Sequence, residues 1–248
     1  LMLFIFDFTN RITIFTDNIT TLESLLIYAM KTILYQSDYL GNGFEFATIN
    51  QPDDYEGKVV ATVIRKQCSM PSNKAVLYVH GFNDYFFQSE MAQKFNEKGF
   101  HFYAVDLRKY GRSTLPHQKS NNMRSLTEYF ADLDEALDIV RQEGNEQVLL
   151  SGHSTGGLLV TLYASERVGN EKFDTIFCNS PFYDMNMPGY QKRLLVPLVA
   201  LFGKYFPDVL LPGKISEWYG HSLHGEKKGE WDYNLVWKPH LVPALNAG

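Results

Sequence analysis

The segment Gly152-His153-Ser154-Thr155-Gly156 restricts the fold of this chain more than any other feature. It directly follows the apolar run Val148-Leu149-Leu150, which is typical of a buried strand. A G-x-S-x-G pattern after a strand predicts a sharp turn into a helix that holds the serine hydroxyl out at the edge of a sheet. Gly156-Gly157 would allow the helix and the strand to approach as closely as such a turn requires. Ser154 is therefore the candidate nucleophile, with an ordinary strand-to-helix turn as the alternative.

Strands and helices are predicted to alternate along most of the chain. Apolar runs between turn residues indicate strands at Phe44–Ile49, Val59–Ile64, Ala75–Val79, Phe100–Val105, Gln147–Leu150 and Phe173–Cys178. Helices are expected at Thr20–Tyr35, Ser89–Lys98, Leu126–Arg141 and directly after Ser154. Ser125 and Glu128 form a capping box at the start of the third helix. This order implies an α/β fold with a mostly parallel sheet that begins with an antiparallel hairpin.

Ligands of such sheets bind beyond the carboxyl ends of the strands, and four polar residues are expected there: His80, Asp106, Ser154 and Asn179. Acyl transfer to a serine also needs donors aimed at the oxygen that becomes negative. The N–H groups of Thr155 and Phe82 are the expected donors, because Thr155 follows the serine and Phe82 follows the flexible Gly81. For His80, a histidine satisfied by hydrogen bonds at a strand end is the alternative role.

The composition excludes several classes of protein. The 248 residues suffice for one large α/β domain, and a net charge of -5 without a basic cluster argues against a nucleic-acid partner. Cys68 and Cys178 lie far apart and outside any C-x-x-C pattern, so neither a disulfide framework nor a zinc site is indicated. We interpret them as reduced thiols of a cytoplasmic protein. Asp7 and Arg11 interrupt the apolar start Leu1–Phe6, so we expect neither an export signal nor a membrane helix.

Three regions are expected along the chain. Residues 1–40 would form an N-terminal extension with a helix, and residues 41–184 would form the α/β core. Residues 185–248 mix proline and glycine with aromatic side chains, and we interpret them as a cap inserted after the sixth strand. Their apolar run Leu194–Phe202 is too short to span a membrane and would suit an acyl chain. An ordinary buried helix pair is the alternative for this region.

Three motifs occur together and in order: His80-Gly81-Phe82, Asp106-Leu107-Arg108-Lys109-Tyr110-Gly111-Arg112-Ser113 and Gly152-His153-Ser154-Thr155-Gly156-Gly157. With them, the chain from about Gly43 to Gly248 resembles the α/β-hydrolase superfamily, and within it the lysophospholipases and monoacylglycerol lipases. The resemblance implies an oxyanion loop, a D-x-R-G-x-G-x-S loop, a nucleophile elbow and a cap. Lys109 departs from the pattern, which usually has glycine at this position.

The resemblance also implies an acid after the next strand and a base histidine after the last one, and these two units are not found in the sequence. Asp184 is the candidate for the acid, with a solvated loop aspartate as the alternative. His153 adjoins the serine, cannot reach round as its base and is expected to position it. The remaining candidates are expected to be surface or core-edge histidines: His221, His224 and His240 in the predicted cap, and His117 in a polar loop.

These observations favour a serine esterase or lipase that cleaves small or lipid-like acyl esters through an acyl-serine intermediate. No metal or organic cofactor is expected, and the partner is a small acyl ester, with transient lipid contact through the cap. Two alternatives stay open: a non-catalytic α/β-hydrolase-like binding protein and an S33-type serine aminopeptidase. Both chain ends are expected to differ from those of the natural protein. The loss of two strands would expose an apolar sheet edge, so we expect poor solubility.

Overall fold

The computed structural model describes residues 33–167, 169, 172–184, 188–206 and 209. The chain divides into two compact units, Leu1–Gln36 and Ser37–Gly248. Only residues 33–36 of the first unit are described, so most of the predicted helix Thr20–Tyr35 lies outside the described residues. Its last three residues, Ile33–Tyr35, are not helical, which corrects the predicted end of that helix. All the helices described below belong to the second unit.

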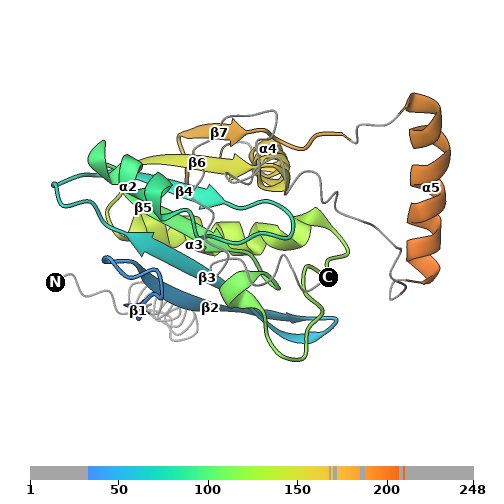
Figure 1. Cartoon of the computed structure of the whole chain (residues 1–248), viewed down its shortest axis with the longest axis horizontal. Coiled ribbons are helices and arrows are strands. Elements are labelled where there is room, and N and C mark those ends of the chain that lie inside the picture. Colours follow the sequence, from blue (N-terminus) through green and yellow to red (C-terminus); the bar gives the residue numbers. More distant parts are fainter. Residues whose placement is uncertain (1–32, 168, 170–171, 185–187, 207–208, 210–248) are drawn as a thin grey trace, which may run out of the picture. The chain divides into compact units, whose positions relative to one another are not determined.

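A seven-stranded mixed sheet carries the site (Figure 1), and its strand order is β1-β2-β3-β5-β4-β6-β7. The strands are β1 (Gln36–Ser37), β2 (Glu45–Asp54), β3 (Gly57–Lys66), β4 (Lys74–Val79), β5 (His101–Asp106), β6 (Gln147–His153) and β7 (Thr175–Asn179). Strand β3 pairs antiparallel with β2 and β5. The neighbours β5, β4, β6 and β7 are parallel to one another. The predicted α/β fold with an antiparallel hairpin at its start is confirmed.

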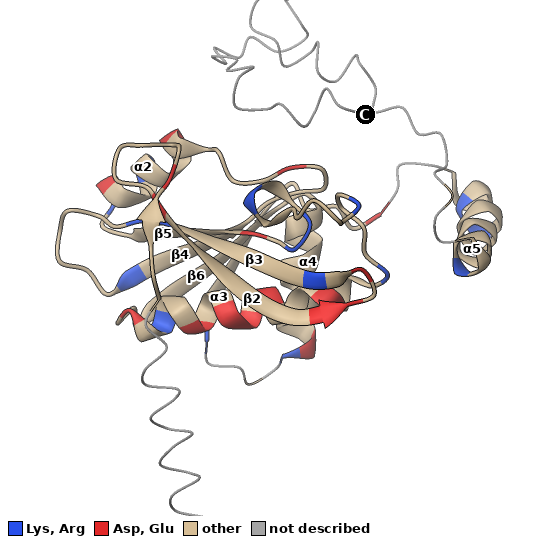
Figure 2. Cartoon of the chain, turned by 90° about the horizontal axis from the view of Figure 1, so that it is seen from below, with Lys and Arg blue, Asp and Glu red and all other residues tan. Residues whose placement is uncertain are grey.

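Helices connect the strands: α2 (Ser89–Glu97), α3 (Phe130–Gln142) and α4 (Thr155–Glu166), with 3-10 turns η1 (Gly111–Ser113) and η2 (Leu126–Tyr129). Figure 2 shows α2 and α3 on opposite faces of the sheet, with acidic residues along α3. Ala92 of α2 packs in one apolar cluster with Val76 and Phe102 of the sheet. The capping box of Ser125 and Glu128 is present, and it begins η2, which leads directly into α3.

Strand β4 lies between β5 and β6 and is buried on both faces. Its residues Ala75–Val79 are at most 6% exposed, as the continuous apolar run predicts for a central strand. The strand ends at Val79, so the loop that begins with His80 starts inside the core. A rigid, fully packed strand therefore holds the first residue of the predicted oxyanion loop.

The β2–β3 hairpin is longer than the sequence indicates. The sequence predicts a strand that ends at Ile49, before the turn-forming residues Pro52, Asp53 and Asp54, but β2 continues to Asp54 with a shift of register between Gln51 and Asp54. Such a bulge tolerates Pro52 in the strand, because proline cannot donate to a regular ladder. Only Tyr55 and Glu56 then connect β2 to β3, and these two residues form the tip of the hairpin.

The region predicted as a cap is described in part. Helix α5 (Gly189–Tyr205) contains the apolar run Leu194–Phe202, with Pro197 inside the helix. His221, His224 and His240 lie outside the described residues. No helix in the described ranges is long and apolar enough to cross a membrane. The cap, like the boundaries of the three regions, stays a prediction.

Candidate active site

Ser154 lies at the sharp turn between β6 and α4. Its φ of 53° and ψ of -119° are rare for a residue with a side chain. Two backbone hydrogen bonds hold this turn: the Ser154 N–H donates to Asn179 O at 3.1 Å, and the Phe182 N–H donates to Ser154 O at 2.9 Å. Asn179 is the last residue of the neighbouring strand β7, and Phe182 follows that strand. Strand β7 and the loop after it therefore hold Ser154 in its strained backbone conformation.

The glycines around Ser154 are required by close backbone contacts. A Cβ on Gly152 would lie 2.4 Å from Gly156 O, and a Cβ on Gly156 would lie 2.3 Å from His80 O. A Cβ on Gly157 would lie 2.9 Å from the Cβ of Pro181. Since real Cβ atoms do not come so close, helix α4 can pack here only without side chains. This is the close approach that the Gly-rich motif predicts.

The loop after β4 lies directly against the serine. A Cβ on Gly81 would lie 3.2 Å from Ser154 Cβ. His80 is buried, its Nδ1 lies 2.8 Å from Gly81 O, and its Nε2 accepts the Leu107 N–H at 3.1 Å. His80 therefore links the loops after β4 and β5 through its two ring nitrogens. This agrees with the alternative role given for it above, a histidine satisfied by hydrogen bonds at a strand end.

Two backbone N–H groups near Ser154, those of Thr155 and Phe82, have no hydrogen-bond acceptor among the described residues. Thr155 is the first residue of α4, so its N–H has no acceptor within the helix, and the positive end of the helix dipole lies here. The Phe82 N–H also has no acceptor among the described residues, while the Phe82 side chain is 56% exposed. The two residues belong to the two segments that adjoin the serine, the start of helix α4 and the loop after β4, and both line one small cavity.

Asp84 is a charged group in the same loop that the sequence analysis did not single out. Its Oδ1 accepts the Tyr85 N–H at 2.8 Å. Burial raises the pKa of Asp84, against the opposing influence of His80 and His153. The only sequence signal for it is the short polar stretch Asn83-Asp84 after Phe82.

No described histidine is bonded to the Ser154 hydroxyl. The Nδ1 of His153 lies 3.2 Å from Asn179 O, and the exposed His117 has its Nε2 3.0 Å from Lys58 O. Asp184 is exposed, and its carboxylate contacts Lys192. The described contacts therefore do not join Asp184 or His117 to the serine.

The second loop motif is held together by buried ion pairs. Asp106, at the end of β5, accepts from the Arg112 side chain at 2.8 Å and from the Phe86 N–H at 2.8 Å. The same Arg112 pairs with Asp38 at 2.7 Å, which the sequence did not indicate. Asp106 therefore lies at the expected strand end but is fully buried and serves the shape of the loops.

Lys109 keeps the backbone shape of the glycine that it replaces. Its φ is 65°, in the left-handed region that glycine favours. Its buried Nζ lies 2.7 Å from Asp54 Oδ2 and 2.7 Å from Glu56 Oε2, at the tip of the β2–β3 hairpin. Burial alone would lower the pKa of Lys109, but the two carboxylates outweigh it and the pKa is raised. Lys109 stays charged and ties the hairpin to this loop.

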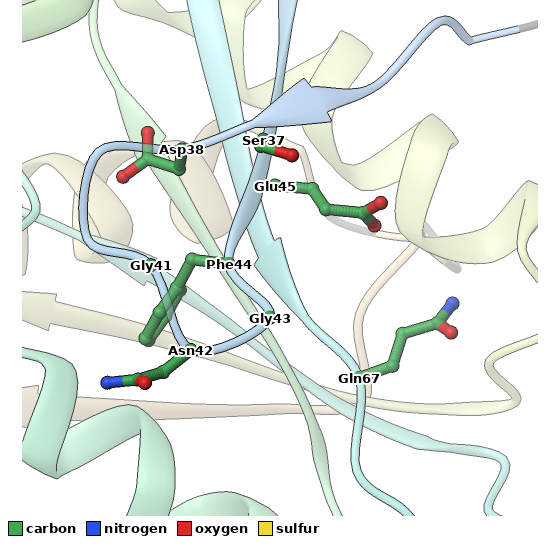
Figure 3. Close-up of a pocket in the computed structure, with 8 residues that line it drawn as sticks. All are labelled: Ser37, Asp38, Gly41, Asn42, Gly43, Phe44, Glu45 and Gln67. Atoms are coloured by element: carbon green, nitrogen blue, oxygen red, sulfur yellow. The ribbon is translucent and has the colours of Figure 1, made fainter.

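Two cavities differ in their relation to the site. A small one of about 30 Å³ adjoins Phe82 and Thr155. A larger one of about 500 Å³ lies at the turn before β2 (Figure 3), and its lining includes Asp38 and Glu45. Both of these carboxylates are already paired, with Arg112 and Arg65, and Ser154 is not part of this lining. The small cavity is the one that belongs to the candidate site.

Within the described ranges no cluster of three or more His, Cys, Asp or Glu side chains is arranged to hold a metal ion. Cys68 and Cys178 are both free thiols.

Comparison with known proteins finds a family whose model matches most of this chain. The model of the family described as "Serine aminopeptidase, S33" matches residues 70–230. Among curated proteins, none matches the chain. Similar solved structures include a thermostable carboxyl esterase from Bacillus coagulans, at 20% identity and a TM-score of 0.52, covering 70% of this chain and 61% of that one.

Two further structures are similar in fold. A soluble variant of monoglyceride lipase from Saccharomyces cerevisiae has 18% identity and a TM-score of 0.50, covering 76% of this chain and 58% of that one. DcsB, solved with its substrate analogue, has 16% identity and a TM-score of 0.51, covering 70% of this chain and 59% of that one. The chain thus spans about 60% of the length of these structures.

Proposed function

Because the chain belongs to the serine aminopeptidase S33 family of the α/β-hydrolase superfamily, we propose that it is a serine hydrolase of the esterase or lipase type. Its substrates are small or lipid-like carboxylic esters, and Ser154 is the nucleophile. The observation that carries the proposal is the backbone of Ser154, held at a φ of 53° by bonds to Asn179 and Phe182. Strain of this kind persists at functional sites, where the surrounding structure fixes it.

The reaction follows from the groups around the serine. The Ser154 oxygen attacks the ester carbonyl carbon, and its proton passes to a base outside the described residues. The N–H groups of Phe82 and Thr155 stabilise the negative oxygen of the tetrahedral intermediate. The alcohol then leaves, protonated by the same base, and water releases the acid from the acyl-serine. His80, Gly81, Gly152, His153 and Gly156 maintain the shape of the two loops.

The acid and the base are the unassigned part of this machinery. Asp184 remains a candidate for the acid, although it contacts Lys192 in the structure. Assigning the base requires residues outside the described ranges. A cytoplasmic location and brief contact of the cap with lipid are part of the same proposal.

Labelling with a serine-reactive fluorophosphonate tests the nucleophile. The phosphonate phosphorus forms a bond to the serine oxygen, and fluoride leaves with the serine proton. We expect the wild-type protein and Ser165→Ala to be labelled, because Ser165 is an exposed serine on α4. Ser154→Ala should not be labelled and should lose about a million-fold in kcat, as for a serine nucleophile elsewhere. Labelling of a folded Ser154→Ala variant would overturn the assignment.

An aminopeptidase is the second candidate, because the matching family is described by that activity. A panel of p-nitrophenyl esters and aminoacyl p-nitroanilides separates the two, since only a peptidase hydrolyses the amides at a comparable rate. The binding-protein alternative predicts neither turnover nor labelling in the wild-type protein.

A further inference from the structure

The Phe82 N–H, one of the two proposed oxyanion donors, belongs to the peptide between Gly81 and Phe82. This peptide is trans and planar, so its C=O and its N–H point in opposite directions. His80 Nε2 accepts the Leu107 N–H, so the ring proton is on Nδ1, which lies 2.8 Å from Gly81 O and donates to it. A hydrogen bond from His80 therefore fixes the carbonyl side of the peptide.

The residue after Phe82 is held by a second side chain. Asn83 has a φ of 53°, and Asn121, 38 positions later, has a φ of 60°. Both values lie in the left-handed region, where asparagine is found more often than most residues. The two side chains are bonded to each other, since Asn121 Nδ2 donates to Asn83 Oδ1 at 3.0 Å. This bond joins the loop after β4 to the loop after β5, one residue past the Phe82 N–H.

Asn121 is itself fixed by the loop around Lys109. Its N–H donates to Lys109 O at 3.0 Å. The Nζ of Lys109 is fully buried and lies 2.7 Å from both Asp54 Oδ2 and Glu56 Oε2, in the β2–β3 hairpin. Because buried ion pairs are costly to separate, the backbone at Asn121 has little freedom to move. It is therefore a firm anchor for Asn83.

Both asparagines lie close to the proposed site. Asn83 directly follows Phe82, and Met123, two residues after Asn121, lines the small cavity together with Phe82 and Thr155. Residues with side chains keep a left-handed backbone where the surrounding structure fixes them, and such residues cluster at active sites. A change in the geometry of this pair would therefore move an oxyanion donor.

We propose that Asn121 is a positioning residue of this hydrolase: through its hydrogen bond to Asn83, it holds the Phe82 N–H in the orientation that stabilises the oxyanion. This inference rests on the proposed function and adds a residue to its machinery. An oxyanion donor is effective because it is held in place before the charge develops, so a loop that turns away loses part of the stabilisation. Asn121 acts through Asn83 and is not itself a catalytic residue.

Asn121→Gly tests this inference in the whole chain, because it removes the amide while glycine adopts a φ of 60° without strain. Hydrolysis of p-nitrophenyl acetate measures kcat and KM. We expect kcat and kcat/KM to fall together by about tenfold or more, towards the roughly 100-fold loss that follows removal of an oxyanion donor, with KM unchanged. Asn42→Gly is the matched control, since it makes the same change at an exposed asparagine with a φ of 49° in the turn before β2. It should keep the wild-type kcat.

Two further variants separate positioning of the donor from general loosening of the loop. In Asn121→Asp, the Asn83 amide can turn over and donate to the new carboxylate, so this variant should recover most of the kcat that Asn121→Gly loses. Asn83→Gly removes the same hydrogen bond from its other partner and should lower kcat to a similar extent. The double variant Asn83→Gly with Asn121→Gly should lose no more than either single variant, because all three lack the same bond.

Urea unfolding of each variant shows that the folded protein is being compared. A folded Asn121→Gly or Asn83→Gly protein with the wild-type kcat, or with a change in KM alone, overturns the inference and leaves Ser154 as the nucleophile. Losses that multiply in the double variant overturn it as well, since the two asparagines would then act separately. A wild-type protein that neither hydrolyses the ester nor reacts with the fluorophosphonate contradicts the proposed function itself.

Discussion

At the scale of single residues, the site depends on positions where no side chain fits. Gly156, the second residue of helix α4, lies against the end of strand β4, and an added Cβ would lie within 2.4 Å of both Val79 O and His80 O. Neither carbonyl can move freely, because Val79 at the end of β4 and His80 directly after it are both buried. Glycine at this position is therefore required for the turn at Ser154 to form, and not only for the reaction of the serine.

Gly156→Ala should lower the free energy of unfolding by about 3 kcal/mol, the upper part of the range for overpacked cores. Urea unfolding followed by circular dichroism measures this. Gly203→Ala is the control, since it makes the same change in helix α5 with no atom within 4 Å. It should leave stability unchanged or raise it by up to about 1 kcal/mol through helix propensity. Equal free energies of unfolding for the two variants would show that the backbone moves away from the added methyl group at position 156 without cost.

At the scale of elements, the β2–β3 hairpin and the loop after β5 are joined by one buried cation. Burial alone would raise the pKa of Asp54 and Glu56, but the hydrogen bonds from Lys109 outweigh it and both pKa values are lowered. Carboxyl groups with lowered pKa stabilise the fold above their unfolded values of about 4, and this contribution is lost as the pH falls through the folded values.

Lys109→Met should therefore destabilise the protein most at neutral pH. Removing one partner leaves two carboxylates unpaired, and we expect a loss of about 3 kcal/mol at pH 7. In the variant the pKa of both carboxyl groups should rise, because burial is then unopposed. The difference from wild type should shrink as the pH falls from about 6 to below about 4.

Urea unfolding at a series of pH values measures this difference. Lys58→Met serves as the control, because Lys58 is exposed on the same hairpin and should differ from wild type by less than about 0.5 kcal/mol. A Lys109→Met effect that does not change between pH 7 and pH 4 would mean that lost packing, and not charge, causes it.

At the scale of the whole molecule, strand β7 is an edge of the described sheet and carries exposed apolar side chains. Ile176 is 40% and Phe177 55% exposed, and Phe182 and Tyr183 continue this surface. Unpaired backbone groups beside apolar side chains favour association between edges. The poor solubility expected from the sequence therefore has a specific location in the fold.

We expect this chain to associate as its concentration rises and Phe177→Lys to reduce the association. Sedimentation velocity at several concentrations measures it through the change in the average sedimentation coefficient. Met70→Lys adds the same charge at an exposed apolar residue away from β7 and should have a smaller effect. A concentration-independent monomer for the wild-type chain would show that β7 is covered in solution.

Most of the local structure was predictable because its signals are local. The apolar run of β4, the capping box at Ser125 and the glycines around Ser154 each act within a few residues of one another. The ends of elements were less predictable. Strand β2 continues past Pro52, since a bulge and pairing with β3 outweigh the turn preference of the local sequence.

The sequence by itself determined the order of elements, the elbow and the residues at the strand ends, since spacing and glycine requirements are written in neighbouring positions. Only the tertiary structure decided that β5 lies between β3 and β4, and that Lys109 takes Asp54 and Glu56 as partners. It also gave Asp106 a structural role and left a cavity of about 30 Å³ beside Phe82. These outcomes depend on which segments pack together, because burial and ion pairing act between residues that are not neighbours in the sequence, such as Lys109 and the two carboxylates that lie more than 50 positions before it.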